Sequence, residues 1–157
     1  MKNFWKMMAL AALLIVGVGC GPIEDGEEKP MPEPELEVTP NNIAGTWTLL
    51  TLNGKDIAEG SYVYIDFVRA DRTFTLYQNV DSFGNRTLTG RYYIYVDDEL
   101  GVAMIRGEYD HGAGEWNHRY IVKSLTHNTM VLEAKDNEGD VCYYQRTELP
   151  AELLPTE

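Results

Sequence analysis

The chain has 157 residues, and its 13 basic and 25 acidic side chains give it a formal net charge of −12. Nucleic-acid binding requires clustered lysine and arginine to hold the phosphates, so this balance argues against a nucleic-acid partner. Hydrophobic residues make up 44% of the chain, which is enough for one core of about 100 residues. We therefore expect a single globular domain.

Residues 1–19 have the organisation of an export signal. Two lysines are followed by an uncharged, apolar run over residues 7–18, which is shorter than the roughly 20 residues that a membrane-spanning helix needs. The run ends in Gly17-Val18-Gly19-Cys20, which resembles the lipobox of bacterial lipoproteins, although leucine is usual where Gly17 stands. The resemblance implies that residues 1–19 are removed and that the acylated Cys20 anchors the protein to a membrane. A soluble secreted protein with an incidental cysteine is the alternative.

Residues 20–42 have the composition of a tether. They contain five prolines and seven acidic residues against the single basic residue Lys29, so this segment repels itself and favours an extended backbone. An acidic stretch after a lipidated cysteine resembles the signal that sends some lipoproteins to the outer face of the outer membrane. We therefore expect an outer membrane lipoprotein exposed at the cell surface, with a merely solvated linker as the alternative. Residues 148–157 form an acidic tail.

Between residues 43 and 147, polar and apolar residues alternate, and turn residues recur about every 10 to 12 positions. Short connections make strands that follow each other in sequence neighbours in space, and an up-and-down barrel leaves no exposed edge. A two-sheet sandwich is the alternative, but it needs a long crossover, for which only residues 52–60 are available. The pattern predicts an all-β fold with eight antiparallel strands, at about 45–51, 61–69, 73–79, 87–96, 101–108, 116–124, 129–135 and 140–147.

Both ends of this region carry a signature of one barrel family. Gly45-Thr46-Trp47 resembles the Gly-x-Trp motif of lipocalin and calycin barrels, and Arg146 stands where those barrels place an arginine across the tryptophan ring. Residues 71–76 and 90–93 are similar to lipocalin-like domains of Bacteroidetes lipoproteins. The resemblance implies a barrel over residues 43–147 that binds a small apolar or amphipathic ligand. Residues 49–54 also resemble the opening of META domains, which rank second because the Gly-Cys-Asn element of that family is absent.

An eight-stranded barrel has room for its own side chains or for one small ligand. Within the expected lumen, aromatic and thioether side chains adapt to varied apolar shapes, so Tyr92, Met104, Tyr120 and Met130 are the expected ligand-binding residues. If side chains fill the lumen completely, no ligand enters. The more apolar face of each strand places these residues inward: Trp47, Leu49, Val63, Ile65, Phe67, Phe74, Leu76, Tyr92, Ile94, Val96, Met104, Tyr120, Val122, Met130 and Leu132.

A filled barrel implies a different function, that of an accessory or interaction protein. Tyr62, Tyr64, Tyr93 and Tyr95 fall on the faces opposite the lumen. Exposed tyrosines on adjacent strands suit a glycan or a protein partner, because their rings supply contact area at low entropic cost. The alternative is that these tyrosines are ordinary strand-forming residues on a pleated surface.

The sequence contains little evidence for a catalytic site or a cofactor-binding motif. No serine lies in a Gly-x-Ser-x-Gly turn, no glycine-rich phosphate loop is present, and Cys142 lies within a strand, as expected for a buried inert thiol. We expect a non-enzymatic protein without a cofactor or metal. The most metal-like group spans a Gly-Ala-Gly turn, so its spacing implies no coordination geometry; its members are Asp110, His111, Glu115 and His118.

Overall fold

The computed structural model describes residues 31–80 and 84–154. The expected signal peptide, the acylation site Cys20 and the tether up to residue 30 lie outside the described residues. Pro32–Glu157 form one compact unit. In the described part of the chain, no helix has the length and apolar character to cross a bilayer.

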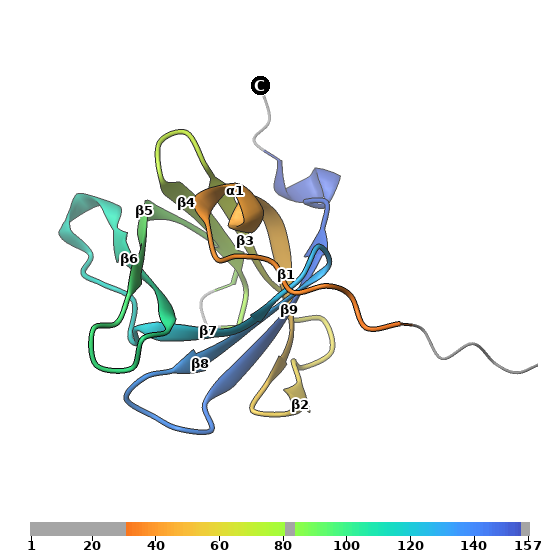
Figure 1. Cartoon of the computed structure of the whole chain (residues 1–157). Helices are drawn as coiled ribbons and strands as arrows, with labels where there is room; N and C mark the ends of the chain where they lie inside the picture. Colours follow the sequence, from red (N-terminus) through yellow and green to blue (C-terminus); the bar gives the residue numbers. More distant parts are fainter. Residues whose placement is uncertain (1–30, 81–83, 155–157) are drawn as a thin grey trace, which may run out of the picture. The chain divides into compact units, whose positions relative to one another are not determined.

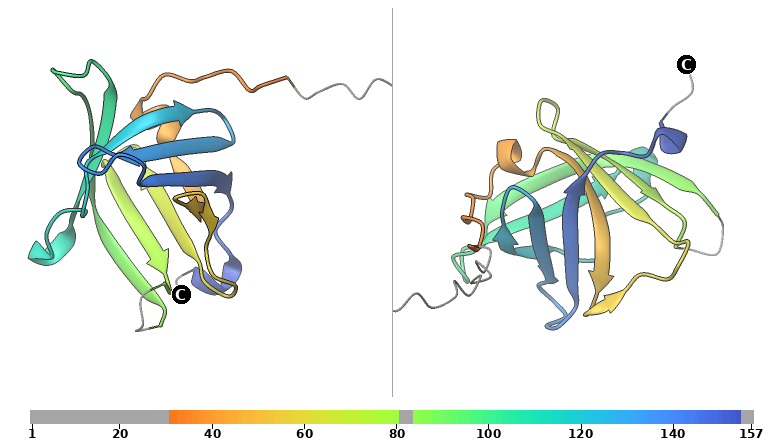
Figure 2. Two further views of the ribbon diagram at one scale, coloured as in Figure 1. Left: turned by 90° about the horizontal axis from the view of Figure 1, so that it is seen from below. Right: turned by 90° about the vertical axis from the view of Figure 1, so that its right-hand side faces the viewer.

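An antiparallel sheet closes on itself to form a barrel (Figure 1). Each strand of the ring pairs with the next, and β1 pairs with both β3 and β9, which closes a ring of eight strands while the short β2 adds to the end of β1. Figure 2 shows β9 beside β1. The up-and-down barrel is thus confirmed over the two-sheet sandwich. The strands are β1 (Gly45–Leu52), β2 (Lys55–Asp56), β3 (Val63–Val68), β4 (Thr73–Gln78), β5 (Arg86–Val96), β6 (Ala103–Tyr109), β7 (Tyr120–Leu125), β8 (Thr129–Ala134) and β9 (Val141–Thr147).

Burial of the side chains follows the predicted two-residue period. In β3, Val63, Ile65 and Phe67 are buried, while the residues between them are partly exposed. The register pairs Ile65 with Trp47 of β1 on one side and with Leu76 of β4 on the other. Because paired residues share a face of the sheet, the inward side chains of neighbouring strands meet in one core.

Two residues that the sequence places in the lumen lie elsewhere. Val96, at the end of β5, is 63% exposed. Met104 is buried, but it pairs with Ile121 on the face of β6 opposite Ile105, and Ile105 is the residue that joins the core. Comparing the number of apolar side chains on the two faces of β6 gave the wrong inward face, because the true inward face carries Gly107, which has no side chain. The space at this glycine is filled by a side chain from another segment.

Helix α1 (Pro40–Ile43) lies across one end of the barrel (Figure 1). Thr39 caps it by accepting a hydrogen bond from the backbone N–H of Asn42 at 3.2 Å, and Pro40 occupies the first turn, where its missing N–H has no consequence. Ile43 is completely buried, and its carbonyl accepts a hydrogen bond from the Trp47 indole at 2.7 Å. The helix therefore joins the core to the first strand. Two short 3-10 turns, η1 (Asp110–Gly112) and η2 (Ala151–Leu153), complete the elements.

The last part of the expected tether packs on the barrel. The carboxylate of Glu35 accepts hydrogen bonds from the Ser124 hydroxyl at 2.6 Å and from the Leu125 N–H at 3.0 Å. The Leu36 N–H donates to the Leu125 carbonyl at 2.7 Å, and the Leu36 side chain packs against the core. We call residues 33–38 the strap. Its acidic composition indicated a solvated chain, but the carboxylates satisfy backbone and side-chain donors at the end of β7, so the compact unit begins before residue 43.

Arg146 lies across the Trp47 ring, as the family resemblance implies, with its guanidinium carbon 4.1 Å from the ring centroid. It also donates three hydrogen bonds to backbone carbonyls: to Ala44 at 2.5 Å, to Asn42 at 2.7 Å and to His127 at 2.7 Å. These contacts join β9 to the segment before β1 and to the β7–β8 turn. A cation that covers an indole face and donates a hydrogen bond from each of its three nitrogens holds this end of the barrel closed.

Replacing Arg146 with methionine should lower the free energy of unfolding by about 2 to 3 kcal/mol, because three carbonyls lose a charged donor and the Trp47 ring loses its cover. Arg146→Lys should recover only part of this, since an ammonium cannot reproduce the planar fork of donors. Urea denaturation measures the effect. Arg91→Met, at an exposed β5 arginine, is the control and should change stability by less than about 0.5 kcal/mol. Equal losses in the two variants would contradict this account.

Docking of the strap should weaken in acid. The hydrogen bonds from Ser124 and Leu125 hold the pKa of Glu35 below its ordinary value of 4.5. A lowered pKa means that the carboxylate stabilises docking above pH 4.5 and that this contribution is lost as the pH falls through the folded-state pKa. The Leu125 amide resonance should therefore titrate below pH 4.5 in the wild type and not in Glu35→Gln, with Glu37→Gln as the control. A midpoint at or above pH 4.5 would contradict the prediction.

Candidate functional site

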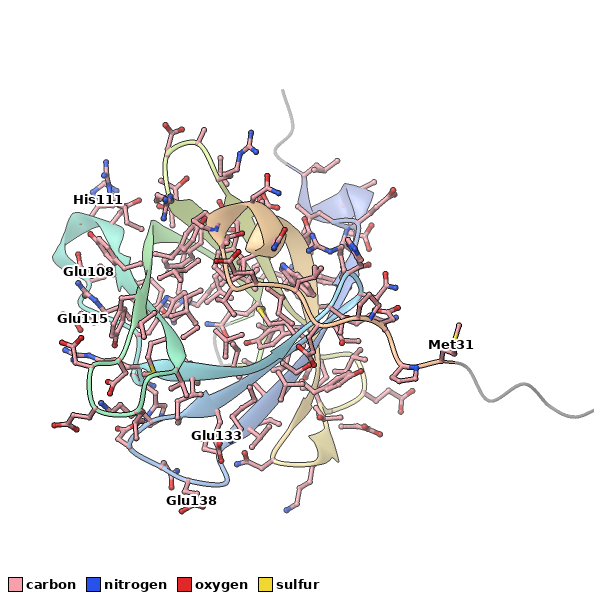
Figure 3. The ribbon with its side chains drawn as sticks, in the orientation of Figure 1. Met31, Glu108, His111, Glu115, Glu133 and Glu138 are labelled. Carbon is pink, nitrogen blue, oxygen red and sulfur yellow. The ribbon has the colours of Figure 1, made fainter. Side chains whose placement is uncertain are left out.

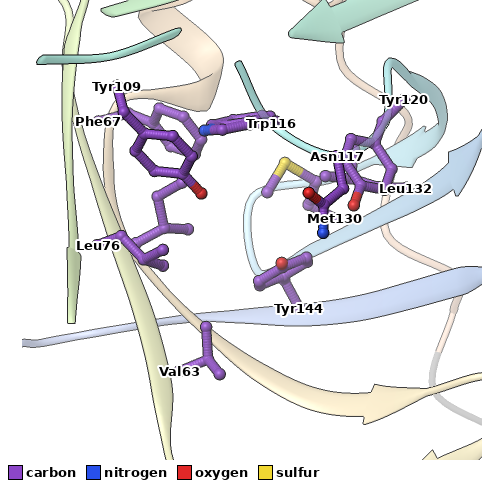
Figure 4. A pocket seen from close by; sticks show the side chains of 11 residues that line it. Val63, Phe67, Leu76, Tyr109, Trp116, Asn117, Tyr120, Met130, Leu132 and Tyr144 are labelled. Atoms are coloured by element: carbon purple, nitrogen blue, oxygen red, sulfur yellow. The ribbon is translucent and has the colours of Figure 1, made fainter. Parts of the chain in front are cut away.

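The interior of the barrel contains a cavity of about 170 Å³ (Figure 4). Its walls are apolar on the side formed by β3, β4 and β8. The residues that make these walls are Val63, Ile65, Phe67, Leu76, Met130 and Leu132. Because they come from three strands of the ring, the cavity is a part of the lumen rather than a surface groove.

Polar groups enter the same cavity from the other side. Figure 4 shows the hydroxyls of Tyr109, Tyr120 and Tyr144 and the amide of Asn117 directed into it. Burial raises the pKa of all three tyrosines, so their phenols stay neutral and can donate a hydrogen bond. Tyr144 lies two residues from the buried Cys142 in β9, so the two side chains share the inward face of that strand. Tyr109 and Tyr120 therefore each present a neutral hydroxyl to the cavity, and a ligand there could use either one as a hydrogen-bond donor or acceptor.

Trp116 occupies the lumen beside this cavity. Its backbone N–H donates to the Gly107 carbonyl at 2.9 Å, and a Cβ atom at Gly107 would lie 2.2 Å from the indole, so only glycine admits the ring here. The indole makes edge contacts with Phe74, at 5.1 Å between ring centroids, and with Phe67, at 6.5 Å. The sequence predicted a strand from residue 116, whereas β7 begins at Tyr120, and the residue that bridges to Glu108 of β6 is Glu115.

The structure brings two of the four expected ligand-binding residues into the cavity. Tyr120 and Met130 line it, while Met104 lies on the other face of β6. Tyr92 is completely buried and contacts the Phe67 ring edge-on at 5.0 Å, but it does not line the cavity. Its hydroxyl has no hydrogen-bond partner among the described residues, and burial raises its pKa.

Sequence reasoning missed four lining residues, which are Tyr109, Trp116, Asn117 and Tyr144. Tyr144 shares a strand face with Arg146, so strict alternation in the last strand would have found it. Gly107 within a strand signals a close approach by another group, but not which one. Asn117 lies in an irregular connection, where no pattern marks it.

A second depression lies on the outside of the barrel, where β1 leaves β3 to pair with β2. Tyr62 and Tyr64 lie side by side there, with ring centroids 5.6 Å apart and planes tilted by 37°. Tyr143 of β9 also lines it. By contrast, Tyr93 is engaged with neighbours, since the Arg106 guanidinium lies 4.4 Å from its ring centroid.

The residues of the metal-like group do not gather around a common point. Asp110 accepts a hydrogen bond from Thr89 at 2.6 Å, Glu115 lies 3.7 Å from Arg106, and His118 pairs with Asp136 at 2.7 Å. Figure 3 shows His111 and Glu115 projecting outward. In residues 31–80 and 84–154, no three His, Cys, Asp or Glu side chains are placed to hold a metal ion.

Cys142 is buried and is the free cysteine of the described chain. Burial raises the pKa of its thiol to about 11, and the thiolate is the nucleophilic form. At neutral pH this side chain therefore behaves as a small apolar residue of the core.

No family model and no curated protein sequence matches this chain. Among solved structures, it is similar to an NMR structure of a protein from Bacteroides uniformis, with a TM-score of 0.49 and 16% identity over 70% of this chain and 92% of that one. It is also similar to the crystal structure of a lipocalin-like protein from the same organism, with a TM-score of 0.48 and 17% identity over 68% of this chain and 98% of that one.

The arrangement of the strands specifies the fold class. Eight antiparallel strands follow one another around the ring, β9 closes it on β1, and Arg146 lies across Trp47 at the covered end. This chain therefore forms a closed, eight-stranded, antiparallel up-and-down barrel, the fold class that the sequence predicted.

Proposed function

We propose that this protein is a membrane-anchored lipoprotein whose barrel binds a small amphipathic molecule and catalyses no reaction. The observation that carries the proposal is the cavity in the lumen, where an apolar wall faces the neutral hydroxyls of tyrosines. Binding pockets in proteins have this combination of apolar lining and a few directed polar groups. The lining contains no charged residue.

The size of the cavity restricts the ligand. Its volume of about 170 Å³ is below the roughly 300 to 1,000 Å³ of pockets for drug-sized molecules. An acyl chain of membrane length does not fit in this space. The ligand is therefore a compact molecule with few heavy atoms, and not a lipid.

A second candidate function is supported by the outer depression. Tyr62, Tyr64 and Tyr143 offer aromatic surface there, next to the hydroxyls of Thr48 and Ser61. Aromatic rings beside hydrogen-bonding groups suit a glycan, which presents both apolar faces and hydroxyls. Binding at this surface is compatible with a lumen that holds no ligand.

The Tyr120→Phe variant should bind the lumen ligand about three- to tenfold more weakly and should fold as well as the wild type. The change removes one hydroxyl without removing volume, and a hydrogen bond contributes about 0.5 to 1.5 kcal/mol. The measurement is native mass spectrometry of the chain from residue 21, after incubation with a metabolite extract, followed by titration of the retained compound. Tyr95→Phe, on the outer face, is the control. A bare mass in every extract would count against lumen binding and favour the outer depression.

The anchor rests on the resemblance of residues 17–20 to a lipobox and on the acidic segment that follows it. Acylation by two or three chains would hold the protein at a membrane durably, whereas one chain would not. The location proposed is the outer membrane, with the barrel at the cell surface.

Cys20→Ser should abolish acylation and release the protein into the aqueous fraction. Cys142→Ser, which changes the only other cysteine, should remain acylated and membrane-bound. Intact-mass measurement and membrane fractionation of both variants, expressed in a bacterium that processes lipoproteins, check this. Membrane retention of the Cys20→Ser variant would refute the proposed anchor.

A further inference from the structure

We propose that the cavity selects a neutral, single-ring aromatic compound with a hydrogen-bonding substituent, and that Trp116 sets this size limit. The inference rests on the proposed ligand-binding function and specifies it. It follows from the volume of the cavity, the chemistry of its lining and the place of one indole in the lumen.

The volume matches one ring. An apolar cavity of about 150 Å³ in another protein stays dry and binds benzene, and the cavity here measures about 170 Å³. Five aromatic side chains contribute to the lining, among them Phe67, Trp116 and Tyr120. Edges and faces of these rings attract a further aromatic ring more strongly than an aliphatic ring of equal size.

The lining also restricts the charge of the ligand. None of the residues around the cavity is charged, so an ionised ligand would lose its hydration without gaining a counter-charge. The available partners are the hydroxyls of Tyr109 and Tyr120 and the amide of Asn117, which can each donate or accept a hydrogen bond. A neutral hydroxyl or amide on the ring satisfies these groups.

Trp116 closes off the space beside the cavity. The indole lies against Gly107 and contacts the edges of Phe67 and Phe74. Its backbone N–H is held by the Gly107 carbonyl, so the ring is a fixed part of the wall. Replacing Trp116 with a small residue would join the cavity to the space that the indole now fills. The enlarged cavity would accommodate a ligand with two fused rings.

The test compares three probes on the chain from residue 21, which contains the whole compact unit. The probes are phenol, cyclohexanol and 2-naphthol, and their affinities are measured by NMR titration of the wild type and Trp116→Ala. We expect the wild type to bind phenol at least tenfold more tightly than 2-naphthol and several-fold more tightly than cyclohexanol. In Trp116→Ala the preference should reverse toward 2-naphthol. Tyr93→Ala, which removes an outer aromatic side chain, should keep the wild-type order.

A second measurement uses the wild-type protein and does not depend on the Trp116→Ala substitution. From residue 21 onward, Trp47 and Trp116 are the two indoles of the chain. Phenol should shift the indole N–H resonance of Trp116 and leave that of Trp47, which lies under Arg146, unchanged. Trp116→Phe assigns the resonance and should show an intermediate change in probe preference, so the inference stays testable if Trp116→Ala does not fold.

The outcomes separate the two proposals. If no probe binds any variant, both the lumen-binding function and this inference are overturned. If probes bind but the ratio of phenol to 2-naphthol is the same in Trp116→Ala, or only the Trp47 resonance shifts, ligand binding stands and the role of Trp116 is overturned. If cyclohexanol binds as tightly as phenol, the selectivity for an aromatic ring is overturned.

Discussion

The contact between Arg146 and Trp47 is the constraint on which the rest of the barrel depends. The guanidinium covers the indole and hydrogen-bonds to Asn42, Ala44 and His127, so one side chain joins the last strand to the helix before the first strand and to the β7–β8 turn. Charged hydrogen bonds to backbone carbonyls resist opening more than apolar contact alone. The cavity lies in the lumen of the ring that this contact helps to close, with its apolar wall on β3, β4 and β8.

The aromatic cluster around Trp116 divides the lumen into a filled part and an open part. Phe67, Phe74 and Tyr92 pack densely near the covered end, and the indole completes this layer. Beyond it, the tyrosine hydroxyls face an apolar wall across the cavity. The two possibilities that the sequence left open, a filled barrel and a ligand cavity, therefore each describe a part of the same interior. Large side chains account for stability in one layer, and neutral hydroxyls beside apolar side chains give the other layer the chemistry of a binding pocket.

Local pattern predicted most of the fold, but only two of the four residues expected to bind a ligand line the cavity. Alternation located every strand of the ring and placed Tyr120 and Met130 inward, because a strand that buries one face repeats every two residues. The prediction was wrong for Met104, since the inward face of β6 includes a glycine and looks less apolar than the outer face. The sequence also assigned the strap to the solvated tether. Several glutamates in a short segment indicate a solvent-exposed chain, and the sequence does not show which hydrogen-bond donors on the barrel their carboxylates contact.

The sequence by itself determined the all-β class, the order of the strands and the pair of residues that closes the barrel, because these depend on periodicity, turn residues and a short motif. Only the tertiary structure decided how the lumen is filled. The fit of the Trp116 indole against Gly107 and the meeting of Tyr109 with Tyr120 at one cavity join separate stretches of chain. The secondary-structure propensities of individual residues do not predict such long-range contacts. These contacts depend on the tilt and register of the strands in the closed ring and on the shape of the space inside it.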